Sequence, residues 1–90
     1  MILGKVTGTV VSTMKLEALK GHKLLIVQPV DAAGRPKGKS LIGLDTVRAG
    51  VGDTVLVLDE GNSARTILGD PQAPIRTVIV GIVDTVSREV

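Results

Sequence analysis

The chain has 90 residues, a formal net charge of +2, no cysteine and no aromatic residue. This length fits one domain over residues 1–90, and the missing cysteines exclude disulfides and thiolate metal sites. So small a positive charge gives little support to a nucleic-acid partner. No stretch approaches the roughly 20 apolar residues that span a bilayer, and the N-terminus lacks the apolar core of a signal peptide. We therefore expect a soluble protein of a reducing cytoplasm.

The first predicted strand covers Ile2–Thr13, where apolar residues and glycines alternate with polar residues. A period of two over this length is typical of a half-buried strand. One face carries Ile2, Gly4, Val6, Gly8 and Val10. Gly4 and Gly8 remove side chains from this inward face, which suits a tight bend or the close packing of a crossing strand.

Two further strands are predicted over Lys23–Val30 and Ser40–Val47, where aliphatic residues dominate. The segment between them, Asp31–Lys39, contains glycines and a proline and is predicted to be a loop. Before them, the lysine-rich connection Met14–His22 contains the single histidine. Since His22 has no second histidine or cysteine with which to share a metal ion, we predict no metal site there.

The last two strands are predicted over Thr54–Leu58 and Ile75–Val86, which are apolar on both faces. Between them, Asn62 or Ser63 can cap a helix by accepting a hydrogen bond from backbone donors. The helix itself, Ala64–Leu68, is little more than one turn long. Five short strands with this one helix predict an all-β fold, a small five-stranded barrel of the oligonucleotide-binding (OB-like) type.

The pattern on the strands predicts that the chain assembles with itself. An antiparallel barrel that works alone alternates apolar and polar residues on every strand, but the second, fourth and fifth strands are apolar on both faces. Covering about five outward aliphatic side chains is worth roughly 1.5–3 kcal/mol each. That total, on the order of 10 kcal/mol, equals the whole stability of a small domain. We therefore expect a homo-oligomer.

Nothing in the chain predicts catalysis. An enzyme needs titratable groups that converge, and here Asp59-Glu60 is the only adjacent pair of carboxylates. Neighbours on a strand face opposite sides, so this pair makes a poor acid–base couple. Gly50-x-Gly52-Asp53 precedes a strand rather than a helix, so we predict a tight turn and not a phosphate loop. We expect no enzyme activity, no cofactor and no catalytic residue.

Two other classes of function stay open at this point. OB-like barrels often bind single-stranded nucleic acid, but they do so by stacking bases on aromatic side chains, which this chain lacks. A small oligomeric adaptor protein is the other alternative.

Several blocks of sequence resemble the EutN/CcmL family, the vertex proteins of bacterial microcompartments. They occur in the family's order over nearly the whole chain: Gly4-Lys5-Val6-x-Gly8-Thr9-Val10-Val11-Ser12-Thr13, Leu19-Lys20-Gly21-x-Lys23-Leu24-Leu25-x-Val27-Gln28-Pro29, Asp45-Thr46-Val47-x-Ala49-Gly50-x-Gly52-Asp53-x-Val55-Leu56, Gly61-x-Ser63-Ala64-Arg65 and Val80-Gly81-Ile82-Val83-Asp84-Thr85-Val86.

This resemblance implies an OB-like barrel that assembles as a homopentamer. It implies a structural role in the bacterial cytoplasm, at the vertices of a polyhedral carboxysome-like shell whose facets are hexameric and trimeric shell proteins. No nucleic acid, membrane or cofactor is implied. The encapsulated pathway is not specified.

The chain departs from the family at three positions. Arg48 stands where the family usually has glycine, Arg76 stands where an acidic residue is common, and Asn62 replaces a smaller residue. The first change puts a bulky cation into a turn, and the second alters a charge contact between subunits.

The resemblance also suggests three groups of site residues. We expect the loops around a five-fold pore, open or plugged, to lie at one end of the barrel and to include Arg48, Gly50, Gly61, Asn62 and Ser63. The candidate residues of the subunit interface are Val57, Leu58, Arg65 and Arg76. The candidate residues of the rim that contacts facet proteins are Lys15, Lys20, Lys23, Arg35 and Lys37.

Overall fold

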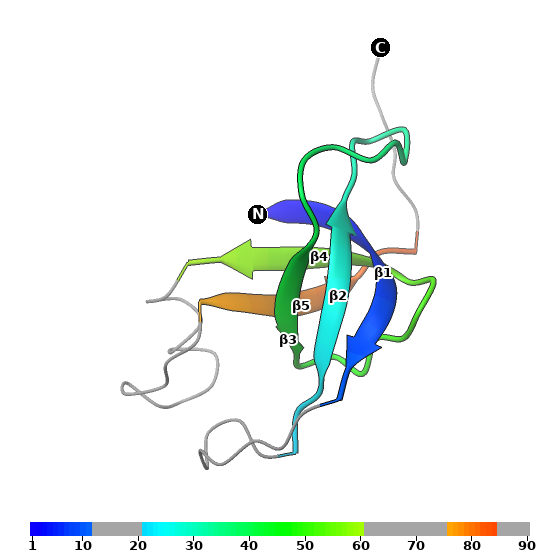
Figure 1. Cartoon of the computed structure of the whole chain (residues 1–90). Helices are drawn as coiled ribbons and strands as arrows, with labels where there is room; N and C mark the ends of the chain where they lie inside the picture. Colours follow the sequence, from blue (N-terminus) through cyan, green and yellow to red (C-terminus); the bar gives the residue numbers. More distant parts are fainter. Residues whose placement is uncertain (12–20, 61–75, 85–90) are drawn as a thin grey trace.

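The structure, a computed structural model, describes residues 1–11, 21–60 and 76–84. Its strands are β1 (Ile2–Val10), β2 (Leu24–Pro29), β3 (Leu41–Asp45), β4 (Thr54–Asp59) and β5 (Thr77–Ile82). They close into a barrel in the order β1-β2-β3-β5-β4 (Figure 1). Only β3 and β5 pair in parallel. The predicted all-β, five-stranded barrel is confirmed, whereas the predicted helix Ala64–Leu68 lies outside the described residues.

Each predicted strand is present, with ends that differ by a few residues. The third strand ends at Asp45 rather than at Val47. The reason is local: the backbone N–H of Val47 donates to Asp45 Oδ1 at 3.0 Å, and this bond turns the chain away from the sheet.

The core is a cluster of small aliphatic side chains inside the barrel. Buried residues alternate with half-buried ones along β2 and β4, so each of these strands has one inner and one outer face. The inner cluster consists of Val6, Leu25, Val27, Ala49, Val55, Val57 and Ile79. The apolar runs of the sequence therefore supply both a core and an outer apolar surface.

The two glycines predicted to face inward on β1 differ in their environment. A Cβ on Gly4 would overlap Val27 Cγ1 and lie 3.2 Å from the carbonyl oxygen of Gln28, so Gly4 permits a close approach of β2. Beyond Val6 a bulge shifts the register. Gly8 consequently pairs with Ile26, and its Cβ would lie 3.4 Å from Ile26 Cδ1. The prediction that Gly8 shares the inward face is therefore wrong, because the bulge reverses the alternation.

The segment between β3 and β4 is a tight turn, as its glycines predicted. Gly50 N–H donates to Asp53 Oδ2 at 2.8 Å, and Asp53 N–H donates to the Gly50 carbonyl at 3.0 Å. Gly52, with φ 95°, donates its N–H to the Val6 carbonyl at 2.9 Å. The turn is thereby fixed to the middle of β1.

Candidate assembly surface

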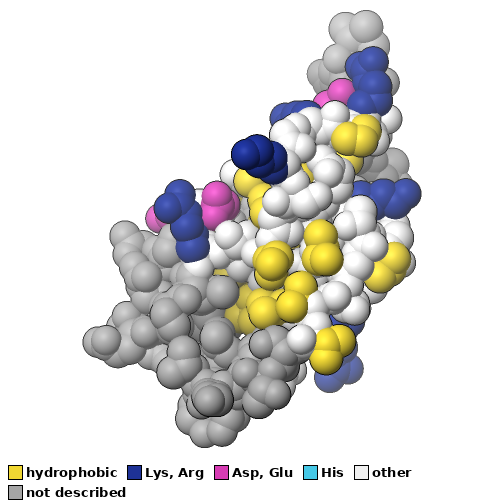
Figure 2. All heavy atoms as spheres, in the orientation of Figure 1, with side chains coloured by type: hydrophobic (Ala, Val, Ile, Leu, Met, Phe, Trp, Pro, Cys, Tyr) yellow, Lys and Arg dark blue, Asp and Glu magenta, His cyan; other side chains and the backbone are white. Residues whose placement is uncertain are grey.

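The outer face of β2 and β3 carries an exposed apolar pair. Ile26 and Ile42 are partners across the two antiparallel strands, and Ile42 is 53% exposed. Figure 2 shows hydrophobic side chains gathered over the middle of the face that these strands present. An exposed group of aliphatic side chains on a small domain is typical of a protein–protein contact.

This apolar surface continues across the neighbouring strands. Leu44 lies next to Gly43, whose Cβ would contact Ile79 in the barrel interior, so Leu44 faces outward. Leu24 pairs with Leu44, and Leu44 pairs in turn with Val78 on β5. Leu44 and Val78 are fully buried although neither belongs to the inner cluster. The outer side of the barrel thus holds a second apolar layer.

The two faces of β4 separate two candidate interface residues. Val57 is fully buried in the inner cluster, whereas Leu58 is half-buried and pairs with Val78 of the outer layer. Val57 is therefore wrong as an interface residue, because its own barrel covers it completely. Leu58 faces the outside and stays a candidate.

Arg76 is held by an ion pair within its own chain. Its Nε lies 3.1 Å from Asp59 Oδ1, which also accepts a hydrogen bond from the Thr77 hydroxyl at 2.9 Å. The Glu60 N–H donates to the Arg76 carbonyl at 3.0 Å. These contacts join the ends of β4 and β5 and leave Arg76 exposed. Arg65, the remaining interface candidate, lies outside the described residues.

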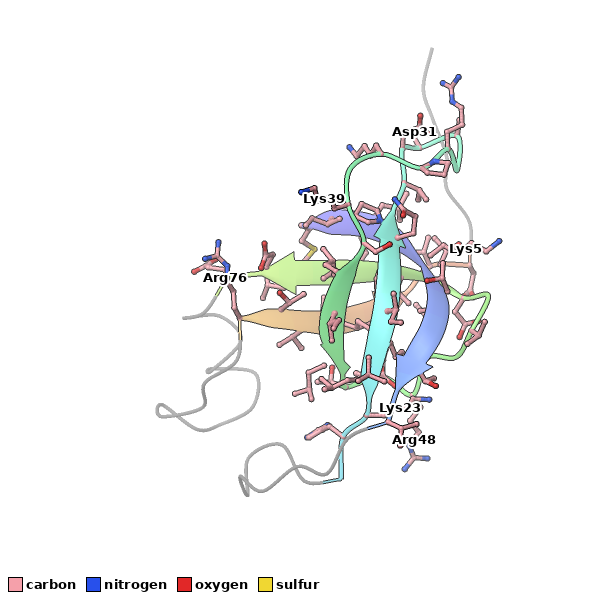
Figure 3. The ribbon with its side chains drawn as sticks, in the orientation of Figure 1. Lys5, Lys23, Asp31, Lys39, Arg48 and Arg76 are labelled. Atoms are coloured by element: carbon pink, nitrogen blue, oxygen red, sulfur yellow. The ribbon has the colours of Figure 1, made fainter. Side chains whose placement is uncertain are left out.

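A charged hollow of about 600 Å³ opens at the end of the barrel where β2 begins and β3 ends. It is lined by Gly21, His22, Lys23, Asp45, Thr46 and Arg48. The Lys23 ammonium lies 3.7 Å from the buried Asp45 carboxylate. Figure 3 shows Lys23 and Arg48 together at this lower end of the barrel. A predicted rim residue and a predicted pore residue therefore line the same hollow.

The loop between β2 and β3 carries the other described rim candidates at the opposite end of the barrel (Figure 3). Asp31 Oδ1 accepts hydrogen bonds from the backbone N–H groups of Ala33 and Arg35, both at 2.9 Å. The N–H of Arg35 is the main cause that holds the pKa of Asp31 below its ordinary value of 3.8, against a smaller effect of desolvation. Arg35 also forms a 3.2 Å ion pair with Asp31.

The described rim candidates do not form one surface. Lys23 precedes β2, whereas Arg35 and Lys37 follow it, so the strand separates them. Their contact with facet proteins stays a prediction, and it would involve both ends of β2. Lys15 and Lys20 lie outside the described residues.

The candidate pore residues are only partly described. Arg48 and Gly50 precede β4, and Glu60, the last described residue before Gly61, follows its other end. The expectation that both loops begin at one end of the barrel is therefore wrong for the part of each loop that the structure describes. Gly61, Asn62 and Ser63 lie outside the described residues.

Comparison with known proteins now decides the family. A family model described as "Ethanolamine utilisation protein EutN/carboxysome" matches residues 1–84. The chain belongs to the EutN/CcmL family. It is 49% identical over 86 residues to the bacterial microcompartment shell vertex protein GrpN of Rhodospirillum rubrum, with 96% of each chain covered. It is 46% identical over 91 residues to the shell vertex protein PduN of Salmonella typhimurium, covering 97% of this chain and 99% of the relative.

Solved structures of EutN/CcmL proteins have the same fold. The structure named "GrpN pentameric microcompartment shell protein from Rhodospirillum rubrum" matches with a TM-score of 0.82 at 46% identity, covering 99% of this chain and all of the other. A structure named "Ethanolamine utilization protein, EutN" matches with a TM-score of 0.87 at 36% identity, covering 98% and 91%.

Membership of this family confirms the structural role and the location expected from the sequence. These are structural shell vertex proteins, found in microcompartment shells of the bacterial cytoplasm, and the chain is not an enzyme. Within the described ranges, no group of three or more histidine, aspartate or glutamate residues could hold a metal ion. No helix among those residues is long and apolar enough to cross a membrane.

Reasoning from the sequence of this EutN/CcmL protein missed the hollow and the Ile26–Ile42 pair. The run Leu24–Val27 has no polar residue, so it cannot show which side chains face outward. Asp45 is one of several scattered carboxylates in the sequence. Only the closing of the barrel brings the Asp45 carboxylate to 3.7 Å from the Lys23 ammonium. It also brings Nδ1 of His22 to 3.2 Å from the carbonyl oxygen of Asp45.

Proposed function

We propose that five copies of this chain assemble into a ring that occupies the vertices of a microcompartment shell. The outer apolar layer carries this proposal. It spans strands β2, β3, β5 and β4, and its edge is exposed at Ile42. Leu44 and Val78 are already buried within one chain, so contact with a second copy covers the exposed and half-buried part of the layer, at Ile42, Ile26 and Leu58. Burial of this part is worth roughly 25 cal/mol per Å² of apolar area. A relative of 46% identity is named a pentameric microcompartment shell protein.

In this proposal the partners are the chain itself and the hexameric and trimeric shell proteins of the facets. A sheet of hexagonal tiles is flat, and five-fold points are needed to close it into a polyhedron. The ring therefore acts by geometry alone, without chemistry of its own. The loop that contains Arg48 and Gly50 is our candidate for one lining of the five-fold opening.

Leu58 and Ile42 are the interface residues that the proposal favours among the described part of the chain. Both are aliphatic side chains on the outer face, and both pair with residues of the outer layer or its exposed edge. The exposed, charged loop at Arg35 and Lys37 remains a candidate contact with facet proteins. Asp31 holds its backbone in one conformation, which lowers the entropy lost on binding.

Co-expression with hexameric facet proteins tests the role. With the wild-type chain we expect closed particles in electron micrographs, and without it open sheets or tubes. Ile42→Asp puts a carboxylate into the proposed interface and should give the open forms. Lys5→Gln, which changes an exposed residue of β1 outside the proposed facet-contact loop, is the control and should close shells normally. Closed particles in the absence of the chain would contradict the vertex role.

A further inference from the structure

The charged hollow at the lower end of the barrel shares Arg48 with the loop proposed above for the five-fold opening, but it contains neither Ile42 nor Leu58 of the proposed interface. Two permanent cations, Lys23 and Arg48, and the single histidine line it together with one carboxylate, that of Asp45. All of these residues come from one chain, so the hollow is complete before any assembly. Its volume of about 600 Å³ accommodates a small hydrated ion.

The carboxylate in the hollow is already satisfied. Asp45 is 4% exposed, its Oδ1 accepts the N–H of Val47 at 3.0 Å, and its Oδ2 lies 3.7 Å from Lys23 Nζ. One negative charge thus faces two positive charges. Among the described residues, no carboxylate lies within ion-pair distance of Arg48. Among the described residues that line the hollow, the two cations therefore exceed the one carboxylate.

Arg48 occupies its position against a backbone preference. Its φ is 58°, in the left-handed region, where a side chain is disfavoured and glycine is the usual residue. Arg48 is also the only residue other than glycine with a positive φ among the described residues. Strained residues of this kind concentrate at functional sites. Arg48 is one of the residues that line the hollow, and its planar guanidinium matches carboxylate and phosphate oxygens.

His22 is held at the edge of the hollow by a contact with the backbone. Its Nδ1 lies 3.2 Å from the carbonyl oxygen of Asp45, and since a carbonyl only accepts, Nδ1 carries the hydrogen. This contact fixes the ring beside Asp45 within a single chain.

We propose that this hollow binds a small oxyanion, a phosphate or carboxylate group, through the guanidinium of Arg48 and the ammonium of Lys23. Each subunit carries one such site. The site does not depend on the ring or on the shell, because its lining belongs to a single barrel.

Titration of the full-length, isotope-labelled protein with inorganic phosphate, followed by NMR, tests this site. Amide NMR spectra are recorded at pH 7 and constant ionic strength, with chloride as the balancing anion. We expect saturable shifts of the amides at Gly21–Lys23 and Thr46–Ala49. Arg48→Gly and Arg48→Ala should each weaken phosphate binding by about tenfold or more, because each removes charge-assisted hydrogen bonds. The two variants differ in backbone strain, so a loss in both comes from the side chain.

Lys39→Gln is the matched control, since it removes one cation at the opposite end of the barrel (Figure 3) and should leave phosphate binding unchanged. A parallel titration with acetate identifies the ligand class. Saturation by acetate with the same dependence on Arg48 assigns carboxylates, and saturation by phosphate alone assigns phosphate groups. Shifts that do not saturate, or phosphate affinity that is equal in wild type and Arg48→Gly, would overturn the proposal.

The proposed function and this site fail separately. Native mass measurements on the same samples report assembly, and the titration reports the hollow. A wild-type monomer that binds phosphate would contradict the ring and leave the site standing. A wild-type ring that shows no saturable phosphate binding would contradict the site and leave the ring standing.

Discussion

Arg48, in the turn before β4, carries a positive charge at a position where the backbone has a positive φ. The backbone there has φ 58°, in the left-handed region that glycine adopts most readily. A side chain in the left-handed region costs roughly 1–2 kcal/mol, and glycine costs roughly 0.5–1 kcal/mol in unfolded-state entropy. The balance favours glycine for stability alone.

We therefore expect Arg48→Gly to stabilise the protein by about 0.5–1 kcal/mol, because relief of strain exceeds the added entropy of the unfolded chain. Thermal unfolding at equal chain concentration measures this as a rise of roughly 2–8 °C in Tm. Arg48→Ala removes the same charge but keeps the strain, so its Tm should stay close to that of the wild type. Equal Tm values for the two variants would contradict the strain at Arg48.

Gly4 and Gly8 form a second test at the residue scale. Gly4→Ala places a Cβ against Val27 and the Gln28 carbonyl, so we expect a loss of roughly 1–3 kcal/mol in the free energy of unfolding. Gly8→Ala is the control, because its Cβ meets Ile26 at an ordinary 3.4 Å. Urea unfolding at fixed chain concentration compares them. A loss in Gly8→Ala as large as that in Gly4→Ala would show that the bulge is misplaced.

At the scale of elements, the loop between β2 and β3 depends on one carboxylate. Asp31 accepts two backbone hydrogen bonds, and its pKa is lowered in the folded state, mainly by the N–H of Arg35. A lowered folded pKa means that ionised Asp31 stabilises the fold above its ordinary pKa of 3.8, and that this contribution is lost as the pH falls through the folded value.

We accordingly expect the amides of Ala33 and Arg35 to be protected from hydrogen exchange at pH 5–7 and to lose that protection below about pH 3.8. Asp31→Asn should show weak protection at every pH, since a neutral amide oxygen accepts these bonds less strongly. Protection in the wild type that is unchanged down to pH 2 would contradict the role of the ionised carboxylate.

The inner face of β4 serves folding, and we propose that its outer face serves assembly. Val57→Asp puts a charge into the barrel interior, so we expect the far-UV circular dichroism of the folded barrel to be lost. Leu58→Asp puts the same charge on the outer face, so we expect the strand signal to persist while the native mass falls. If both variants stay at the wild-type mass, or both unfold alike, the assignment of the two faces is wrong.

The sequence predicts where the strands lie better than it predicts which of their side chains point into the core. Branched aliphatic runs and glycine-rich turns suffice to place all five strands, and the excess of outward apolar residues suffices to predict assembly. The register past Val6 is not predictable from alternation, because the bulge inserts a residue without a sequence signal of its own. In the runs around Leu25 and Val57 every residue is apolar, so only the closed barrel decides which side chains enter the core.

The candidate sites were predicted less well than the fold, for the same reason. A site on a barrel joins loops that are distant in sequence, and a resemblance transfers residue types rather than positions in space. Lys23 and Arg35 are both exposed cations, which makes them alike in sequence, yet they lie at opposite ends of β2. Arg48 was singled out because it breaks the glycine pattern, and this departure did mark an unusual backbone position.

In the whole molecule, two apolar layers serve folding and assembly. The inner layer and the buried Leu44 and Val78 of the outer layer fold a single barrel, whereas the exposed part of the outer layer, at Ile42 and its half-buried partner Ile26, is left for a neighbouring copy. A chain of this size buries only about 60–65% of the surface of its unfolded form, so the added burial between subunits matters for stability. The same contact would set the five-fold geometry that a closed shell requires.

The native mass of the protein at low micromolar concentration tests the five-fold ring directly. We expect a single species of five times the 9.3 kDa of one chain. We also expect Ile42→Asp to shift the mass toward one chain while the circular dichroism of the barrel persists. A wild-type protein that stays at the mass of one chain, folded and stable, would contradict the ring.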